Sequence, residues 1–469
     1  MYKKKTHVHF VGIGGIGMSG IAQILRHQGY EISGCDVNLE QKSIKDLQAL
    51  GCKISGEHNS CLCQDKNIDI LVYSSAIRSN TPEIALAQQR GIPTIPRALM
   101  LAELMRTKYS IAISGAHGKT TTTSLVGHIL TEAKLDPTLI VGGHLENIST
   151  NAKLGSGDFL VAEADESDRS LLKLKATLAI VTNIDLEHLE TYKDLDDIKN
   201  TFKAFLDNLP FYGKAIVCAD DENIASILPL THVKTIQYGI KNKLDIWAEN
   251  IELHPSHSTF NLFKKDIQKS LGSIKMNMPG EHNVLNCLAA IALCLELGLE
   301  LEVIIQAIES FKGVDRRFSY RGCTTNGAEI FDDYGHHPKE IESTIKVAKK
   351  RTKGKLMVAF QPHRYTRTEK LWDSFVNTLA NSPIDTLVIT DIYPASEDPI
   401  ENINSKRLVD SIKAQNPNLE IIYLPKDDDF KLITNHFQEI LKPNDLLLLL
   451  GAGRINQIAD QIKEEKTAV

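Results

Sequence analysis

Two glycine-rich loops, each between an apolar strand-like run and a helix-like run, constrain the fold of this chain most. The first, GIGGIG at residues 12–17, joins an apolar run at residues 6–13 to helix-like apolar spacing at residues 16–28. The second, SGAHGKTTTTS at residues 114–124, follows the apolar run KYSIAIS. A glycine-rich turn into a helix lets the backbone approach an anion at the helix N-terminus, where free N–H groups favour phosphate. The pattern predicts two α/β units that each bind a phosphate group.

Strand-like and helix-like runs alternate along most of the chain, which predicts parallel sheets with crossover helices. The length of 469 residues suits about three domains. We expect a Rossmann-like unit over residues 1–106, a central phosphate-loop (P-loop) unit over residues 107–313, and a second Rossmann-like unit over residues 314–469. Residues 245–278 alternate polar and apolar side chains, so we also expect a small antiparallel sheet in the central unit. The predicted fold class is α/β in three domains.

Composition and charge argue against several classes of protein. A hydrophobic content of 42% and a charged content of 24% are typical of a globular protein, and a net charge of −6 argues against nucleic acid as a partner. The longest apolar run near the end, DLLLLLGAG, is too short to span a membrane. None of the eight cysteines forms a C-x-x-C pair, which favours reduced thiols over a zinc site. We expect a cytoplasmic protein.

The first loop matches the pattern G-x-G-x-x-G, which is typical of sites for a dinucleotide or another diphosphate. Asp36 ends the next strand-like run, where a carboxylate can accept a hydrogen bond from a ribose hydroxyl group. The motif does not distinguish NAD from another ligand that carries a diphosphate. Glycines that serve only the packing of strand against helix are the alternative interpretation.

The second loop contains Gly-Lys-Thr but has Ile113 where the common P-loop pattern requires glycine. Lys119 can still reach phosphate oxygens, and the Thr120 hydroxyl can bind Mg²⁺. Glu163 and His188 follow the next two strand-like runs, DFLVA and ATLAIVTNID. Because the carboxyl ends of parallel strands meet at one edge of a sheet, we expect these side chains to converge there. The sequence therefore predicts an ATP and Mg²⁺ site.

Eight motifs, in order along essentially the whole chain, resemble those of the Mur ligases, which use ATP to add amino acids to peptidoglycan precursors. The motifs are GIGGIGMSGIA, SGAHGKTTTT, EADESD, TNIDLEHLETY, EHNVLN, GVDRRF, DDYGHHP and FQPHRYTRT. The family's phosphate loop has a glycine three residues before Gly118, here Gly115, so the residue at position 113 is ordinary for it. The resemblance implies that the N-terminal unit holds the diphosphate of a UDP-sugar rather than NAD.

The resemblance also implies an activity. ATP would convert a carboxylate into an acyl phosphate, and an amino acid would then displace the phosphate. The segment EADESDRSLLKL is most similar to the branch that joins L-alanine to UDP-N-acetylmuramate. One alternative is the family's ligase that recycles a murein tripeptide onto UDP-N-acetylmuramate. The other is an NAD-dependent oxidoreductase built on the first loop, which would leave the predicted ATP site without a purpose.

Carried over position by position, the resemblance assigns four sets of residues. The metal set is Thr120, Glu163 and His188. The UDP-sugar set is Gly14, Gly15, Ile16, Gly17, Met18, Ser19, Asp36, Ser74 and Ser75. The ATP set is Gly115, Ala116, His117, Gly118, Lys119, Thr120, Thr121, His282, Asn283, Asn286, Arg317 and Asp333. The catalytic set is Lys119, Glu163, His188, Arg317, Asp333, His337, Arg364 and Arg367.

Two roles near the incoming amino acid stay open. Arg364 or Arg367 would bind the carboxylate of alanine and leave its amine free to attack. His337 is a candidate for the base that takes the proton of the amine, with bulk water and a purely orienting role for His337 as alternatives. Some Mur ligases carry a carbamylated lysine, and Lys203 lies downstream of His188. The L-alanine branch is not expected to need one, so we leave Lys203 out of the site.

The sequence departs from the family's usual residues at three places. Ala116 stands where threonine is usual, Arg169 where a small residue is common, and Arg454 where an acidic residue is frequent. None of these changes removes a charged group from the expected site.

Overall fold

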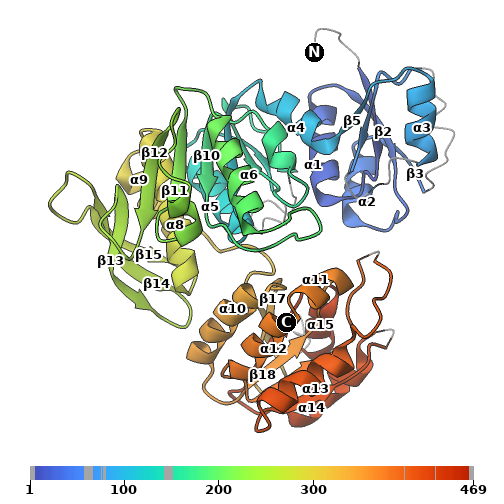
Figure 1. Ribbon diagram of the computed structural model, residues 1–469, viewed down its shortest axis with the longest axis vertical. Coiled ribbons are helices and arrows are strands. Elements are labelled where there is room, and N and C mark those ends of the chain that lie inside the picture. The colour runs from blue at the N-terminus through green and yellow to red at the C-terminus, as the bar shows by residue number, and fades with distance from the viewer. Residues whose placement is uncertain are drawn as a thin grey trace, which may run out of the picture.

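The computed structural model describes residues 6–56, 67–74, 77, 81–141, 152–395, 397–427 and 429–463. It contains three sheets, each covered by helices, and we call the three resulting units the N-terminal, central and C-terminal bodies. Figure 1 shows the N-terminal body at the upper right, the central body at the left and the C-terminal body below both. The predicted α/β fold class is confirmed.

The N-terminal body has a five-stranded parallel sheet in the order β3-β2-β1-β4-β5. The order reverses between β1 and β4, so the glycine loop after β1 lies at the switch point where ligands of such sheets bind. The strand β1 is buried throughout, including His7 and His9, whose rings lie within hydrogen-bond distance of the Ser33 hydroxyl. The strands of the N-terminal body are β1 (His7–Val11), β2 (Glu31–Cys35), β3 (Lys53–Ser55), β4 (Ile70–Tyr73) and β5 (Thr94–Pro96). The helices of this body are α1 (Ile16–His27), α2 (Lys42–Ala49), α3 (Pro82–Gln89) and α4 (Arg97–Met105).

The central body has a ten-stranded sheet in the order β15-β14-β13-β12-β11-β10-β6-β9-β7-β8. The expected antiparallel strands are present, and they continue the parallel sheet because β13 pairs with β12 through Tyr238 and Ile246. Its strands are β6 (Tyr109–Ser114), β7 (Thr138–Ile140), β8 (Ala152–Lys153), β9 (Phe159–Glu163), β10 (Leu178–Val181), β11 (Lys214–Cys218), β12 (Lys234–Gly239), β13 (Ile246–Leu253), β14 (Ser258–Lys264) and β15 (Gly272–Met276).

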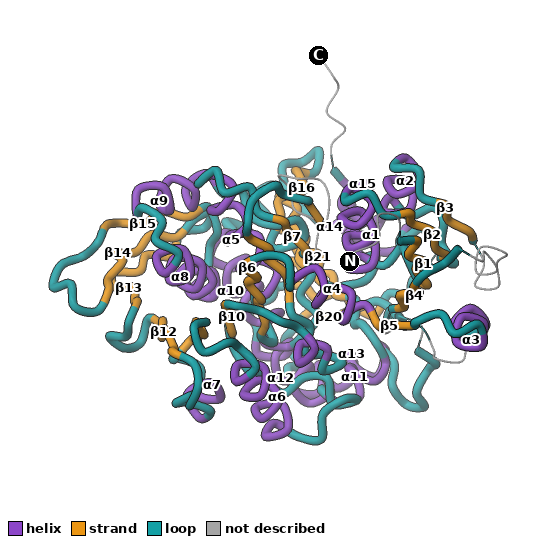
Figure 2. The backbone as a smooth tube through the Cα atoms, turned by 90° about the horizontal axis from the view of Figure 1, so that it is seen from above, coloured by secondary structure: helices purple, strands orange, loops and turns teal. Residues whose placement is uncertain are grey.

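The helices of the central body place the second glycine loop. The helix α5 follows this loop and packs against α8, which lies beside it in Figure 2. Nine of the ten positions of α5 from Thr121 to Leu130 are buried, all but His128, so a well-packed core supports the loop. The helices are α5 (Lys119–Glu132), the short 3₁₀ helix η2 (Ser170–Lys173), α6 (Leu195–Asp207), α7 (Glu222–Ser226), α8 (Glu281–Glu296) and α9 (Leu301–Ser310).

The C-terminal body has a six-stranded sheet in the order β16-β17-β21-β18-β19-β20, in which β16 is the antiparallel edge strand. Its strands are β16 (Ser319–Cys323), β17 (Glu329–Asp333), β18 (Leu356–Phe360), β19 (Thr386–Ile389), β20 (Glu420–Tyr423) and β21 (Leu446–Leu450). Its helices are α10 (Pro338–Arg351), α11 (Tyr365–Lys370), α12 (Trp372–Asn381), α13 (Ser405–Gln415), α14 (Lys431–Ile440) and α15 (Ile458–Ile462), with the short 3₁₀ helix η3 (Ile455–Gln457).

The run of five leucines is the fully buried strand β21. Leu446, Leu448 and Leu450 face one core of the C-terminal body, and Leu447 and Leu449 face the other. A parallel strand that is buried on both faces has this continuous apolar sequence. Within the described ranges, the chain has no helix of the length and apolar character that crossing a bilayer requires.

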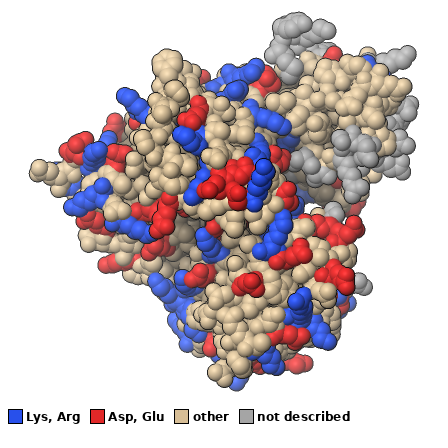
Figure 3. Space-filling view, viewed as in Figure 1, with Lys and Arg blue, Asp and Glu red and all other residues tan. Residues whose placement is uncertain are grey.

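Charged side chains of both signs lie on the surface (Figure 3), and the cysteines are unpaired among the described residues. On the face shown in Figure 3, basic and acidic side chains are interspersed over the central and C-terminal bodies. The six cysteines among the described residues are all free thiols, and five of them are buried. Cys61 and Cys63 lie outside the described residues.

Replacement of Leu448 by alanine tests the role of β21. Leu448 is completely buried, so Leu448→Ala leaves a cavity that we expect to lower the free energy of unfolding of the C-terminal body by about 2–5 kcal/mol. Denaturant titration followed by circular dichroism measures this loss. Leu432→Ala is the matched control, because Leu432 is 47% exposed. An equal loss in both variants would contradict the assignment.

Candidate active site

The loop between β6 and α5 is held by two glycines in backbone conformations that other residues rarely adopt. Gly115 has φ of 133° and Gly118 has φ of 83°. A Cβ atom on Gly115 would lie 2.1 Å from Thr182 Oγ1, and one on Gly118 would lie 2.3 Å from Asn286 Oδ1. Both glycines are therefore required by strain and by space. Because Gly118 has no side chain, Asn286 in the second turn of α8 can lie directly against the loop.

A cavity of about 340 Å³ lies where this loop, α8 and the C-terminal body meet. Its volume falls in the range of small-molecule sites. Eight residues of the predicted ATP set line it: His117, Gly118, Thr121, His282, Asn283, Asn286, Arg317 and Asp333. The lining also includes residues that the motifs did not single out, among them Asp220, Asp221, Tyr238, Lys241 and Glu340. The other four predicted ATP residues, Gly115, Ala116, Lys119 and Thr120, form the loop and helix start and are not among the lining residues.

The C-terminal body contributes Arg317 and Asp333 to this cavity. The Arg317 guanidinium lies 3.6 Å from the Glu340 carboxylate of α10. Asp333 ends β17, and its carboxylate accepts hydrogen bonds from the N–H groups of Phe318 at 2.8 Å and Gly335 at 2.7 Å. Burial raises the pKa of Asp333. Both predicted residues are thus fixed at the edge of the cavity.

The Lys119 ammonium group is satisfied by protein groups. It donates to the carbonyl oxygens of Gly115 at 2.5 Å and Ala116 at 3.0 Å, and it lies 2.7 Å from Glu166 Oε1. Burial acts to lower the pKa of Lys119, but the nearby carboxylates of Glu166 and Glu187 together outweigh it, and the pKa is raised. Lys119 is therefore a fixed positive charge beside the loop. A phosphate group that reaches it must compete with Glu166.

His188 lies among three carboxylates. Its Nε2 is 3.5 Å from Glu166 and 3.7 Å from Glu187, and its Nδ1 is 3.5 Å from Glu190. Burial acts to lower the pKa of His188, but hydrogen bonds to Glu166 and Glu190 outweigh it and raise the pKa to about 9. The donor atoms of Glu166, Glu187 and His188 lie within 4.8 Å of one another. Such a set of oxygen and nitrogen donors can bind a divalent cation.

The predicted metal set of Thr120, Glu163 and His188 is only partly gathered. Glu163 ends β9 beside Ile113 of β6, next to the glycine loop. Across the described ranges, no group of three close His, Cys, Asp or Glu donors contains Glu163, whereas Glu166 takes part in one with His188. The motif EADESD contains Glu166 as well, three residues after Glu163.

His117 connects the glycine loop to the C-terminal body. Its Nε2 is 3.3 Å from Asp185 of the central body, and its Nδ1 is 3.4 Å from Glu340 of α10. Burial acts to lower the pKa of His117, but hydrogen bonds to these carboxylates outweigh it and raise the pKa to about 10. Lys339, also on α10, lies 2.7 Å from Asp185. We call His117, Asp185, Lys339 and Glu340 the interdomain charge cluster.

His337 stands at the N-terminus of α10 and caps it. Its Nδ1 accepts a hydrogen bond from the Lys339 N–H at 3.4 Å. Burial and the charge of His117 lower the pKa of His337 to about 4. With the lone pair of Nδ1 used in the cap, the hydrogen-bond network assigns the ring proton to Nε2. This tautomer favours the orienting role for His337 over that of a base.

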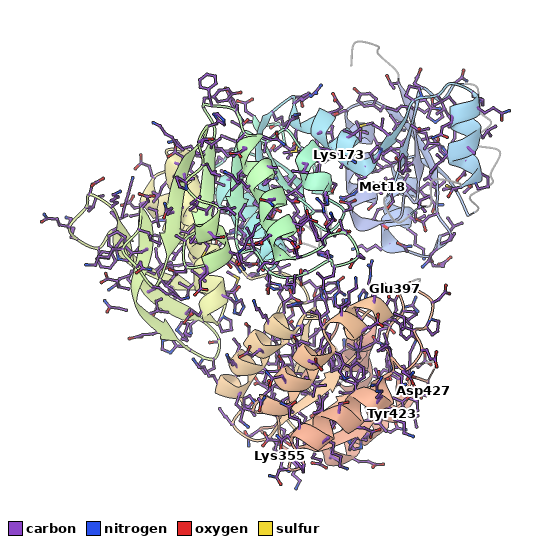
Figure 4. All side chains as sticks on the ribbon, viewed as in Figure 1. Met18, Lys173, Lys355, Glu397, Tyr423 and Asp427 are labelled. Carbon is purple, nitrogen blue, oxygen red and sulfur yellow. The ribbon has the colours of Figure 1, made fainter. Side chains whose placement is uncertain are left out.

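Arg364 and Arg367 lie on a small cavity of about 20 Å³ that also touches His188, Glu190 and His337. Arg364 lies 3.9 Å from both Glu190 and Glu397, and Arg367 donates to the carbonyl oxygen of His363 at 3.3 Å. Figure 4 labels Glu397 at the upper edge of the C-terminal body. A cavity of this size holds about one water molecule, so a larger ligand requires these side chains or the body to move.

The first glycine loop uses Asp36 as part of its framework. The Asp36 carboxylate accepts hydrogen bonds from the N–H groups of Gly14 at 2.8 Å and Asn38 at 3.1 Å, and it is buried. Sequence reasoning assigned it to a ribose, and in the structure both oxygens already shape the loop. Met18 and Ser19 are buried as well.

The other residues of the predicted UDP-sugar set lie around the same loop. Gly15 donates to the Gly12 carbonyl oxygen at 3.3 Å, and Ser74, at the end of β4, donates to Val11 at 3.3 Å. Gly17 lies in the first turn of α1. Ser75 and the side chain of Ile16 lie outside the described residues.

Lys203, which we left out of the site, and Arg169, which departs from the family's usual residue, each form an ion pair. Lys203 pairs with Asp207 on α6 at 3.7 Å. Asp207 belongs to none of the groups of three close metal-binding donors among the described residues. Arg169 pairs with Asp197 at 2.5 Å, and its guanidinium lies 4.6 Å from the ring centre of Tyr192. Arg169 thereby fastens the EADESD turn to the segment that carries His188.

The interdomain charge cluster predicts a pH dependence of stability. The pKa of His117 rises from about 6.5 to about 10 on folding, so its ion pairs stabilise the fold fully below about pH 6.5 and lose that effect as the pH rises towards 10. We expect the difference in free energy of unfolding between wild type and His117→Gln to shrink over this range in denaturant titrations. His232→Gln, at an exposed position, is the control. A difference for His117→Gln that stays constant with pH would contradict the prediction.

Comparison with known proteins identifies the family. Residues 7–109 match the Mur ligase family catalytic domain, residues 113–294 the Mur ligase middle domain, and residues 316–453 the Mur ligase glutamate ligase domain. UDP-N-acetylmuramate–L-alanine ligases from Geotalea daltonii and Persephonella marina are 46% and 45% identical to the chain. The first alignment covers 99% of both chains, and the second covers 98% of this chain and 97% of the relative.

Solved structures agree with this assignment. UDP-N-acetylmuramate-alanine ligase MurC from Thermotoga maritima superposes with a TM-score of 0.79 at 28% identity, over 97% of this chain and 98% of that one. The fold is shared with MurF ligase from Thermotoga maritima in complex with ADP, with a TM-score of 0.62 at 16% identity over 92% and 94% of the two chains. Three matching domains in order, full-length relatives and a cavity lined by the predicted ATP residues lead to one conclusion: the chain belongs to the Mur ligase family.

Proposed function

We propose that this chain joins L-alanine to the lactyl carboxylate of UDP-N-acetylmuramate, using ATP and giving UDP-N-acetylmuramoyl-L-alanine, ADP and phosphate. The full-length relatives that bear this activity in their names support the choice of substrates. The observation that carries the proposal is the cavity of about 340 Å³, because the glycine loop, α8 and the C-terminal body meet there with a nucleotide-sized space between them. Because the chain belongs to the Mur ligase family, the alternative function of an NAD-dependent oxidoreductase has no support.

The three bodies divide the work in this proposal. Residues 1–106 bind the UDP-sugar, residues 107–313 bind ATP, and residues 314–469 close over ATP and bind the amino acid. Two observations support these boundaries: Arg106 is the residue directly after α4, and Gly313, with φ of 94°, lies between α9 and β16.

The chemistry requires activation of the carboxylate. A carboxylate oxygen of UDP-N-acetylmuramate attacks the γ-phosphorus of ATP, so that ADP leaves and an acyl phosphate forms. The neutral amine of L-alanine attacks the acyl carbon, phosphate leaves, and the amine loses a proton to solvent or to a base. Phosphoryl transfer depends mainly on positioning and on neutralising charge. A fixed ammonium group beside the glycine loop supplies such a charge.

Several side chains have proposed roles in these steps. Lys119 leaves Glu166 and binds phosphate oxygens, while Arg317 approaches the nucleotide from the C-terminal side. Thr120, Glu163 and His188 would hold Mg²⁺, and the oxygen-rich surroundings of His188 suit that ion. When bound, Mg²⁺ offsets negative charge on the phosphates.

Arg364 and Arg367 are the proposed partners of the alanine carboxylate. A guanidinium group binds a carboxylate through paired hydrogen bonds, which would orient the amine towards the acyl carbon. Glu190 and Glu397 lie within 3.9 Å of Arg364, so they hold its guanidinium in place before the amino acid arrives.

Replacement of Lys119 separates the two substrate sites. We expect Lys119→Ala to lower kcat by at least about 10²–10³-fold, because a charge that stabilises the transition state is lost. The affinity for UDP-N-acetylmuramate, measured by calorimetry without ATP, should stay near that of wild type. Lys265→Ala is the control, since Lys265 is exposed and distant in sequence from the loops. Loss of UDP-sugar affinity together with activity would contradict this division of labour.

Choice of the second substrate tests the function itself. We expect phosphate release and a product whose mass equals UDP-N-acetylmuramate plus L-alanine minus water. The tripeptide L-Ala-γ-D-Glu-meso-diaminopimelate should give neither. Turnover with the tripeptide and none with L-alanine would instead identify the recycling ligase of the same family.

A further inference from the structure

Arg97 is a charged residue that the sequence motifs did not single out, and it lies between the two glycine loops. It is the first residue of α4, directly after β5, and its side chain is only 20% exposed. The helix α1, which follows the first glycine loop, also contacts β7 and β8 of the central body. Arg97 therefore stands where the N-terminal and central bodies meet.

The guanidinium group of Arg97 lies directly over the first turn of α1. A Cβ atom on Gly17 would be 2.6 Å from Arg97 Nη1, so the glycine at this position leaves the room that the guanidinium occupies. Figure 4 labels the next residue, Met18, in the same turn. The first ladder bond of this turn runs from the Ser19 N–H to the Gly15 carbonyl oxygen. The N–H groups before Ser19 lie outside this ladder. Free N–H groups at the start of a helix attract an anion, and so does a guanidinium group close to the same turn.

A carboxylate of the central body holds Arg97 in this position. Arg97 Nη2 lies 3.5 Å from Asp165 Oδ2. The other oxygen of Asp165 accepts a hydrogen bond from the Ser167 N–H at 2.9 Å, which fixes the carboxylate. The next residue, Glu166, pairs with Lys119. The EADESD turn therefore presents one carboxylate to the UDP-sugar side and the next to the ATP loop.

We propose that Arg97 binds the diphosphate of the UDP-sugar at the N-terminus of α1, and that Asp165 is a positioning residue that holds the Arg97 guanidinium there. The inference rests on the proposed function for the identity of the sugar nucleotide. It adds a cation from α4 to a loop whose other contacts are backbone N–H groups. It also gives Gly17 a specific purpose, because any side chain there would displace the guanidinium.

Direct binding measurements test this proposal without the ligase reaction. We expect Arg97→Met to raise the Kd for both UDP and UDP-N-acetylmuramate by about 10–100-fold in calorimetry without ATP or alanine, since a charged hydrogen-bond donor to the diphosphate is lost. Arg97→Lys should recover part of the affinity. Asp165→Asn should raise both Kd values by a smaller factor, about 3–10-fold, because the guanidinium stays but is held less firmly.

Controls separate this role from a structural one. Arg106→Met is the matched variant, since Arg106 directly follows the same helix and pairs with Glu103 at the surface, and it should bind both ligands as wild type does. In steady-state kinetics, Arg97→Met should raise KM for UDP-N-acetylmuramate and leave KM for ATP unchanged. Thermal unfolding of each variant shows whether the fold is intact. If Arg97→Met fails to fold, Asp165→Asn and Arg97→Lys provide the test.

Three results would overturn the proposal: wild-type affinity in Arg97→Met, a loss confined to UDP-N-acetylmuramate with UDP unaffected, or an equal loss in Arg106→Met. Failure of the proposed function would look different. Wild-type protein would then bind UDP and lose that binding in Arg97→Met, yet form no product from L-alanine.

Discussion

The contact between the glycine loop after β6 and the C-terminal body is the interaction on which the rest of the site depends. His117 in the loop lies between Asp185 and Glu340, which belong to different bodies, and Lys339 adds a second ion pair to Asp185. Because His117, Asp185 and Glu340 are largely shielded from water, their attraction is stronger than that of surface ion pairs, whereas Lys339 is 65% exposed and adds less. This contact closes the cavity between the two bodies and brings Arg317 to its edge.

The cations of the same region are held in place by nearby carboxylates. Lys119 and His188 both lie beside Glu166, and Arg97 lies beside Asp165, so each cation has a protein partner before any substrate binds. Partner carboxylates avoid the high free energy of unpaired buried charges. The EADESD turn thereby links the two glycine loops through adjacent residues of the chain.

Much of the fold and of the nucleotide site could be predicted from short-range patterns. The glycine loops, the apolar strands and the residues that follow them are local features, and parallel strands necessarily bring their carboxyl ends to one edge. A local pattern does not indicate which partner a side chain finds. Asp36 bonds to its own loop, His337 caps a helix, and Glu166 rather than Glu163 lies next to His188.

The sequence by itself determined the three α/β bodies, the two glycine-rich loops and the family, because glycine spacing and apolar runs act on the neighbouring backbone. Only the tertiary structure decided how the charges pair. The contacts of His117 with Glu340 and of Arg97 with Asp165 join residues that are far apart in the chain. Such pairs depend on how the bodies pack and which groups lose water, and a local pattern contains neither.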